Sequence, residues 1–164
     1  MTDSFRYYDL HAQEYLSSTL YVDMSLHYQL FLSHIPDDGR VLDAGCGSGR
    51  DSRYFLDRGY SVQAFDLSEE MVKAARALTN LPVRCLSFQE MDYVAEFDGI
   101  WACSSLLHVP KDQLSEVFSR LRTALKPQGI LYCSFKNQNE DFSKDGRLFT
   151  CFNEQQFRGF IGSL

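Results

Sequence analysis

The sequence has no excess of basic residues. Its 16 Lys and Arg are outnumbered by 22 Asp and Glu, which gives a formal net charge of −6 at pH 7. Proteins that bind nucleic acid regardless of its sequence, or that lie on a membrane surface, need a basic face. The charge balance therefore argues against both classes, and we expect a chain that contacts neither nucleic acid nor membrane.

Long apolar runs and targeting signals are also lacking. No stretch approaches the length of a membrane span, and the N-terminus has no basic region followed by an apolar run, as a signal peptide would. The five cysteines are dispersed without a C-x-x-C pair, which favours free thiols in a reducing compartment over a disulfide framework or a zinc site. We expect a cytoplasmic protein with no metal site, in which His27 and His34 are surface residues.

The most informative stretch is VLDAGCGSG, at residues 41–49. A β-rich run ends in an acid, three alternating glycines follow, and a helical pattern begins at about residue 50. This order predicts a strand, a tight turn and a helix N-terminus, and the glycines let a ligand approach the backbone closely. In an open α/β sheet, the crevice beyond such a strand end binds a nucleotide-like ligand.

The spacing of the glycines separates two classes of nucleotide-like cofactor. The dinucleotide fingerprint is G-x-G-x-x-G, whereas here the third glycine falls at Gly49 and Arg50 stands where that fingerprint has its last glycine. Asp43 would repel a pyrophosphate but suits a positively charged ligand. S-Adenosylmethionine has a sulfonium, an ammonium and no phosphate, so the turn favours it. The alternative is a turn that merely connects strand and helix.

At these residues the sequence resembles the class I S-adenosylmethionine-dependent methyltransferases, whose first motif reads much like VLDAGCGSG. FDGIWACSSLLHVP at 97–110 and L-K-P-x-G at 125–129 carry the same resemblance, which covers roughly residues 1–160. It is strongest toward the compact branch that acts on small molecules, which includes tellurite-resistance-type methyltransferases. The resemblance implies S-adenosylmethionine as cofactor and S-adenosylhomocysteine as product, with cofactor-binding residues at Asp43, Gly45, Cys46, Gly47 and Gly49.

A strand predicted over 61–66 ends in a second acid. Asp66 follows the glycine turn by about 20 residues, where a carboxylate accepts the ribose hydroxyls in these folds. Capping of the next helix is the alternative role, since an acidic pair begins that helix. We also expect Leu67 and Met71 at the edge of the cofactor. The resemblance implies that the adenine lies beside Ser87 and Phe88, although Ser87 replaces the acid that the family often has there.

Substrate-side residues are expected after the strand at 99–103 and in the N-terminal helices, which are predicted over 3–17 and 21–34. Cys103 is small enough to pack against the methionine chain of the cofactor. His108 lies in the loop just beyond, where a histidine can act as a general base; a structural hydrogen bond is its alternative role. The resemblance implies that the first helix, with Tyr8 and Tyr15, covers the cofactor pocket, whereas packing at the domain edge is the alternative for these tyrosines.

Strands alternate with helices through the middle of the chain, which predicts an α/β fold with a doubly wound, Rossmann-like, mostly parallel sheet in the order 3-2-1-4-5. Helices are predicted over 50–58, over 69–78 and after Pro110, and further strands over 83–86 and 130–135. Residues 137–146 are expected to form a loop, and Asn153 to cap a last helix over 154–160. The antiparallel hairpin that normally closes the family's sheet is expected to be missing, and the bare edge of the fifth strand would favour a homo-oligomer.

We expect one methyltransferase-like domain over 1–164, made of an N-terminal helical cap (1–35), a cofactor-binding α/β core (36–136) and an incomplete C-terminal part (137–164). The expected reaction is methyl transfer from S-adenosylmethionine to a small-molecule acceptor by in-line displacement. The sequence contains neither an inserted substrate domain nor the N-P-P-Y type of motif of base-modifying members. The alternatives are a nicotinamide-dependent oxidoreductase on a similar sheet, and a non-catalytic S-adenosylmethionine-binding module or truncated fragment.

Overall fold

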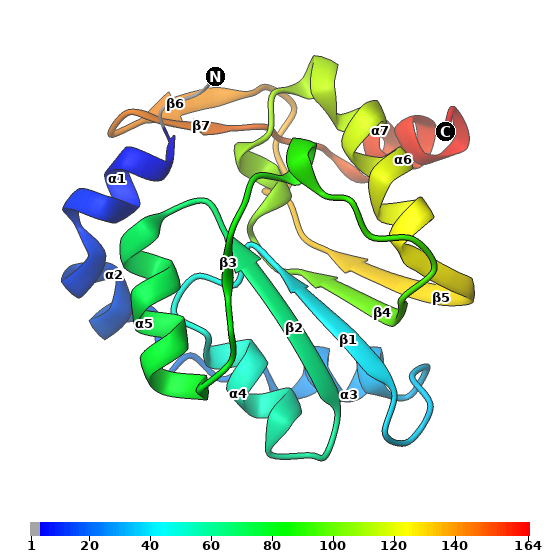
Figure 1. The fold of residues 1–164 in the computed structure, drawn as a ribbon. Helices are drawn as coiled ribbons and strands as arrows, with labels where there is room; N and C mark the ends of the chain where they lie inside the picture. Colours follow the sequence, from blue (N-terminus) through cyan, green and yellow to red (C-terminus); the bar gives the residue numbers. More distant parts are fainter. Residues whose placement is uncertain (1–3) are drawn as a thin grey trace.

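A five-stranded parallel sheet forms the centre of the protein (Figure 1). The computed structural model describes residues 4–164, and the order of strands in the sheet is β3-β2-β1-β4-β5. The strands are β1 (Arg40–Ala44), β2 (Ser61–Asp66), β3 (Arg84–Cys85), β4 (Phe97–Ala102) and β5 (Leu125–Cys133). Each neighbouring pair runs parallel, which confirms the predicted doubly wound fold and its strand order.

Helices cover both faces of this sheet. On one face, α3 (Ser25–Leu32) and α4 (Arg50–Leu56) contribute Phe31 and Phe55 to a buried cluster with Trp101 of β4, and α5 (Glu69–Thr79) packs beside α4. On the other face lies α6 (Leu114–Ala124). Because both faces are covered, the neighbouring residues Val41 and Leu42 are both fully buried and enter different clusters.

Several element boundaries differ from the predicted ones. The first predicted helix is two helices, α1 (Ser4–Leu10) and α2 (Ala12–Thr19), separated at His11; residue 3, where that helix was expected to begin, lies outside the described residues. Pro110 is not the first residue of α6, because its ψ of 141° is extended and a 3-10 turn over 111–113 comes between. β5 already begins at Leu125, which pairs with Phe97 before the register shifts.

A small hairpin lies where a loop was expected. β6 (Phe142–Lys144) and β7 (Arg147–Phe149) pair antiparallel as a separate two-stranded sheet. Asp145 and Gly146 between them both have positive φ, 53° and 76°, and Asp-Gly is a strong hairpin signal that the sequence interpretation overlooked. Within the described residues the five-stranded sheet gains no antiparallel strand, so β5 is its edge, as expected.

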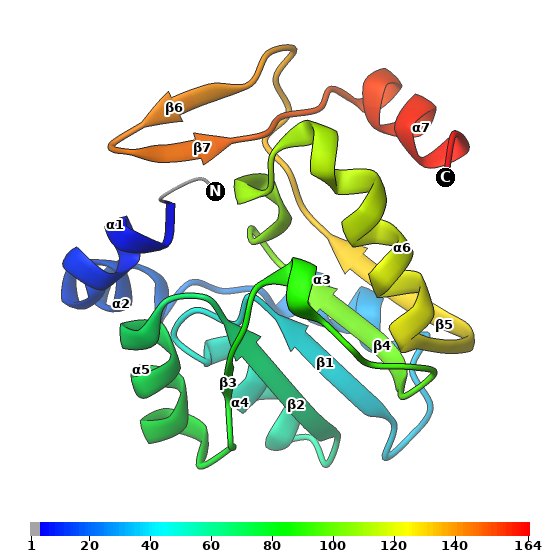
Figure 2. The same cartoon turned by 45° about the horizontal axis from the view of Figure 1, so that its top comes forward.

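The hairpin and α1 both lie toward the carboxyl ends of the parallel strands (Figure 2). The backbone N–H of Leu148 in β7 donates to Ser4 Oγ of α1 at 3.1 Å, and Thr150 N donates to Leu107 O at 2.7 Å. After the hairpin, the side chain of Asn153 caps α7 (Glu154–Gly162) by accepting from Gln156 N, as predicted. Among residues 4–164, no helix combines the length and apolarity needed to cross a bilayer.

Candidate active site

A cavity of about 1030 Å³ opens at the carboxyl ends of β1, β2, β4 and β5. Its walls come from the glycine turn, α1, α2, the loops after β3 and β4, and the hairpin strand β7. Most residues that the sequence singled out line it: Tyr8, Tyr15, Gly45, Cys46, Gly47, Asp66, Leu67, Met71, Ser87, Phe88, Cys103 and His108. Residues from distant parts of the chain thus share one site, at the place where doubly wound folds bind ligands.

Two positions of the glycine turn after β1 have no room for a side chain, and each faces a different element. At Gly45 (φ 74°) a Cβ atom would lie 2.4 Å from Ser105 Cβ, so the loop after β4 leaves no room for a side chain. At Gly49 (φ 80°) a Cβ would lie 2.9 Å from the Ala75 Cα of α5. Gly49 does not line the cavity. It therefore serves the packing of α4 against α5. Gly49 was predicted to contact the cofactor, but it is not among the residues that line the cavity.

Asp66 joins the end of β2 to the glycine turn. One carboxylate oxygen accepts from Gly47 N at 2.8 Å and the other from Ser68 N at 2.9 Å. Burial raises the pKa of the Asp66 carboxyl, while these backbone N–H groups act in the opposite direction. The carboxylate is therefore held rigidly at the cavity wall. The alternative role as a helix cap belongs instead to Ser68, whose Oγ accepts from Met71 N at the start of α5.

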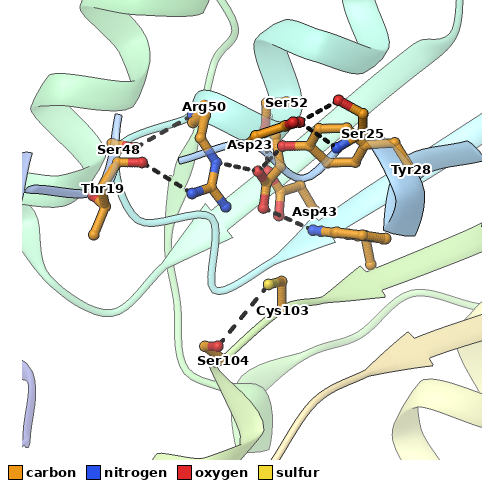
Figure 3. A network of polar contacts seen from close by, with 12 residues as sticks. Thr19, Asp23, Ser25, Tyr28, Asp43, Ser48, Arg50, Ser52, Cys103 and Ser104 are labelled. Carbon is orange, nitrogen blue, oxygen red and sulfur yellow. Dashed lines mark hydrogen bonds and ion pairs between the residues drawn. The ribbon is translucent and has the colours of Figure 1, made fainter. Parts of the chain in front are cut away.

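Asp43 is buried beneath the turn and does not line the cavity. Its carboxylate accepts from Ser52 Oγ at 2.6 Å in the first turn of α4, and burial together with the nearby Asp51 raises its pKa well above the usual range (Figure 3). The expectation that Asp43 faces the cofactor thus does not match its position. The carboxylate that lines the cavity here belongs to Asp51.

Asp51 is the centre of a buried polar network that sequence reasoning missed. It accepts from Arg50 Nε at 2.6 Å, from Trp101 Nε1 at 2.8 Å and from the hydroxyl of Tyr28. Asp51 stands in the first turn of α4, where an acid is usually explained by the helix dipole alone. Only the tertiary fold brings β4 and α3 against it, so the sequence held no clear signal for this role.

The helices α1 and α2, which we call the lid, are attached to the cofactor-side loops. Arg50 Nη1 donates to Thr19 O at 3.0 Å, and Ser68 Oγ donates to the Asp9 carboxylate at 2.6 Å. Tyr15 lies over the glycine turn, with its ring 3.5 Å from where a Cβ at Gly47 would be. Burial raises the pKa of the Tyr15 hydroxyl, which stays protonated at neutral pH.

His108 is held by hydrogen bonds on both ring nitrogens. Nδ1 lies 2.7 Å from the carbonyl of Leu148, which can only accept, so Nδ1 carries the proton. Nε2 therefore accepts from the Tyr8 hydroxyl at 2.7 Å. Burial lowers the pKa of His108 to about 4, with Arg147 and Lys136 acting in the same direction. The structural hydrogen bond that was the alternative reading is present, and a group with this pKa is a weak base at neutral pH.

The continuation of β5 contributes a row of residues that the sequence interpretation did not anticipate. Tyr132, Ser134 and Lys136 are alternate residues, and all three line the cavity. Period-two spacing is the signal that could have found them, because alternate residues of a strand share a face. Among the described residues, no three His, Cys, Asp or Glu side chains come together as a metal site would require.

Comparison with known protein families gives a match over residues 41–129 to the family described as "Methyltransferase domain". A putative methyltransferase YqeM of Bacillus subtilis is 35% identical over 114 residues, covering 62% of this chain and 46% of its own length. An uncharacterized methyltransferase of Staphylococcus carnosus is 27% identical over 147 residues, covering 88% of this chain and 70% of its own. The matches cover 37–46% of the length of several curated relatives.

Solved structures share the fold. A 1,6-didemethyltoxoflavin-N1-methyltransferase of Burkholderia thailandensis, with 1,6-didemethyltoxoflavin and S-adenosylhomocysteine bound, superposes with a TM-score of 0.76 at 24% identity, covering 99% of this chain and 79% of its own. A TehB-like methyltransferase of Corynebacterium glutamicum gives 0.71 at 18% identity, covering 96% and 82%. The family match extends over more than half of the 164 residues. The chain therefore belongs to the family of methyltransferase domains.

Proposed function

We propose that this chain transfers a methyl group from S-adenosylmethionine to a small-molecule acceptor, with S-adenosylhomocysteine as the second product. The observation that carries the proposal is that the glycine turn, Asp66 and the lid surround one cavity of about 1030 Å³. Small-molecule sites usually measure about 300–1000 Å³, so this cavity offers room for a cofactor and a small acceptor together. The family membership and the ligand named for the Burkholderia structure support the same cofactor.

The cofactor half of the cavity has a group for each part of S-adenosylmethionine. We assign Asp66 to the ribose hydroxyls, since its carboxylate is held at the end of β2. The backbone from Gly45 to Gly47 would approach the methionine part, and Asp51 would face the positively charged ammonium or sulfonium. The remaining assignments on this half are Cys46, Leu67, Met71, Ser87, Phe88 and Cys103, all of which line the cavity.

For this methyl transfer the main task of the protein is to align the cofactor and the acceptor. The sulfonium is already a good leaving group, so an in-line displacement at the methyl carbon is accelerated mainly by holding the reactants in line and excluding water. Tyr8 and Tyr15 of the lid would exclude water on the acceptor side. His108 would orient Tyr8 through their hydrogen bond, and its pKa of about 4 makes it a poor general base.

We further propose that residues 1–35 act as a cap, 36–136 as the cofactor-binding core and 137–164 as a partial C-terminal part, in a protein that works in the cytoplasm. The free thiols of this chain support a reducing compartment. Fractionation of cells that express the chain with a tag would test the compartment. Recovery outside the cytoplasm would contradict that part of the proposal.

Calorimetric titration with S-adenosylhomocysteine, and with NADH for comparison, tests the function. We expect S-adenosylhomocysteine to bind with about −7 to −9 kcal/mol and NADH not to bind. Asp66→Ala should weaken binding at least about tenfold. Asp92→Ala is the matched control, because Asp92 is exposed, pairs only with Arg84 among the ion pairs of the described chain, and lies outside the cavity.

The result that overturns the proposal is tight binding of NADH in preference to S-adenosylhomocysteine. That outcome would instead favour the oxidoreductase alternative. Transfer of an isotopically labelled methyl group to a panel of small acceptors then separates an enzyme from a module that only binds the cofactor. Binding without any transfer would favour the non-catalytic module.

A further inference from the structure

Charge is divided between two parts of the cavity wall. The carboxylates of Asp51 and Asp66 line the end formed by the glycine turn and β2, which suits a cofactor that carries positive charge. Another part of the wall is formed by His108, Phe149 of β7 and the chain that follows β5. Its charged lining residue is Lys136, so the two parts of one wall differ in sign.

Lys136 is placed to meet a ligand. Its ammonium lies 5.2 Å from the centroid of the Phe149 ring, its side chain is exposed to the cavity, and within the described chain it forms none of the observed ion pairs with a carboxylate. Arg50, the other cation on the wall, is by contrast paired with Asp51 at 2.6 Å. Of the two Arg and Lys side chains, Arg50 and Lys136, that line this cavity in the described chain, Lys136 is the one that forms no ion pair with a carboxylate.

Hydrogen-bonding groups stand next to Lys136 in the chain that follows β5. Ser134 precedes it by two residues and shares its side of the chain. Ser134 Oγ accepts from Ser104 N at 2.8 Å and lies 3.4 Å from Ser104 Oγ. Ser134 Oγ also donates to Cys103 Sγ at 4.0 Å. Because sulfur is a weak acceptor, the anionic oxygen of a ligand would take this hydroxyl hydrogen in its place. Two hydroxyls and one ammonium thus belong to the same part of the cavity wall.

We propose that the methyl acceptor is a small organic anion, whose ionised group binds beside Lys136 and Ser134 and is itself, or is conjugated to, the nucleophile. This inference rests on the proposed function and adds the substrate class. An ionised oxygen or sulfur uses a lone pair to form the new bond to the methyl carbon. The bond between that carbon and the sulfonium breaks, and its electron pair stays on sulfur as the neutral thioether. The anion and the cation are both neutralised, and no proton has to move.

The surroundings of His108 support an acceptor that arrives already ionised. His108 Nδ1 donates to Leu148 O, and its Nε2 is occupied by the Tyr8 hydroxyl. Burial raises the pKa of Tyr8, and that of His108 falls to about 4. Neither group is suited to take a proton from a neutral alcohol or amine at neutral pH, whereas an anion needs no such base.

The experiment uses the full chain saturated with S-adenosylhomocysteine, so that only the acceptor half is open. Matched pairs of an acid and its amide are titrated near pH 7 by calorimetry, benzoate against benzamide and phenylacetate against phenylacetamide. We expect an acid to bind about tenfold more tightly than its amide, as a hydrogen bond to a charged group implies. Lys136→Gln should remove this preference, and Lys136→Arg should retain most of it.

Lys144→Gln is the matched control, because Lys144 is an exposed lysine of β6 that lies outside the cavity. It should leave the preference unchanged. The inference is overturned if no acid binds better than its amide, or if the preference survives in Lys136→Gln. In both cases S-adenosylhomocysteine would still bind and the proposed function would stand. Failure of S-adenosylhomocysteine to bind would instead overturn the proposed function, and this inference with it.

Discussion

Three glycine-to-alanine substitutions separate backbone strain from steric overlap at the glycine turn. Gly45 and Gly146 have almost the same conformation, with φ of 74° and 76°. Alanine in the left-handed region costs about 1–2 kcal/mol. Gly45→Ala and Gly146→Ala should therefore each lower the free energy of unfolding by that amount. A Cβ at Gly146 meets no described atom within 4 Å, whereas at Gly45 it would lie 2.4 Å from Ser105 Cβ. Overpacking of this kind costs about 1–3 kcal/mol more.

We therefore expect Gly45→Ala to lower the free energy of unfolding by about 2–5 kcal/mol in total, and Gly146→Ala by about 1–2 kcal/mol. Gly159→Ala is the third variant, because Gly159 lies inside α7 without a positive φ and its Cβ would meet no described atom within 4 Å. It should stabilise the protein by about 0.4–1 kcal/mol.

Urea denaturation followed by circular dichroism measures all three differences, provided the unfolding is two-state. A change in midpoint at constant slope would show that stability, and not the extent of exposed surface, has changed. The reasoning is refuted if Gly45→Ala and Gly146→Ala cost the same. That result would mean that the loop bearing Ser105 moves away without a cost, and that the close approach seen in the structure does not constrain the turn.

Three further predictions concern pH, the buried network and assembly. Because the pKa of folded His108 is about 4, below the value of about 6.5 in an unfolded chain, the unfolded state binds more protons between these values. Stability should then rise with pH across that window by up to about 3 kcal/mol, and His108→Gln should flatten this rise in urea titrations at several pH values; an unchanged slope would contradict the assignment. Asp51→Ala removes the carboxylate partner of Arg50 in a buried network and should lower the free energy of unfolding by about 3–5 kcal/mol. Asp57→Ala breaks only the exposed pair with Arg53 and should lower it by less than about 1 kcal/mol. Equal losses of stability in thermal melts would argue against the network. The open edge of β5 should favour association, and sedimentation that stays monomeric at high concentration would refute this.

The strand order was predictable because its determinants are local. Each predicted strand is a short apolar run followed by a turn signal and a helical pattern, and right-handed crossovers then leave few arrangements of such units. Boundaries failed where tertiary pairing decides them. Leu125 reads as the end of a helix, but Phe97 offers it a strand partner, and β3 is reduced to two residues at the other edge of the sheet.

The site was predictable to the extent that its residues stand at strand ends. Gly45, Gly47 and Asp66 directly follow β1 or end β2, and parallel strands bring these ends together. The burial of Asp43 was not predicted, because its sequence position before the turn does not reveal that its carboxylate accepts from Ser52 of α4. The row of Tyr132, Ser134 and Lys136 carried a period-two signal that was missed, but its place at the cavity appears only when the loop after β5 meets the hairpin.

The sequence by itself determined the sheet, its strand order, the glycine turn and the family, because local apolar periodicity and backbone conformation specify them. Only the tertiary structure decided which charges face the cavity. It buried Asp43 beneath the turn and placed Asp51 at the cavity wall. It also paired Tyr8 with His108 across one hundred residues of sequence and brought Lys136 to the same cavity. The physical reason is that solvent exposure, hydrogen-bond partners and pKa depend on neighbours that are remote along the chain.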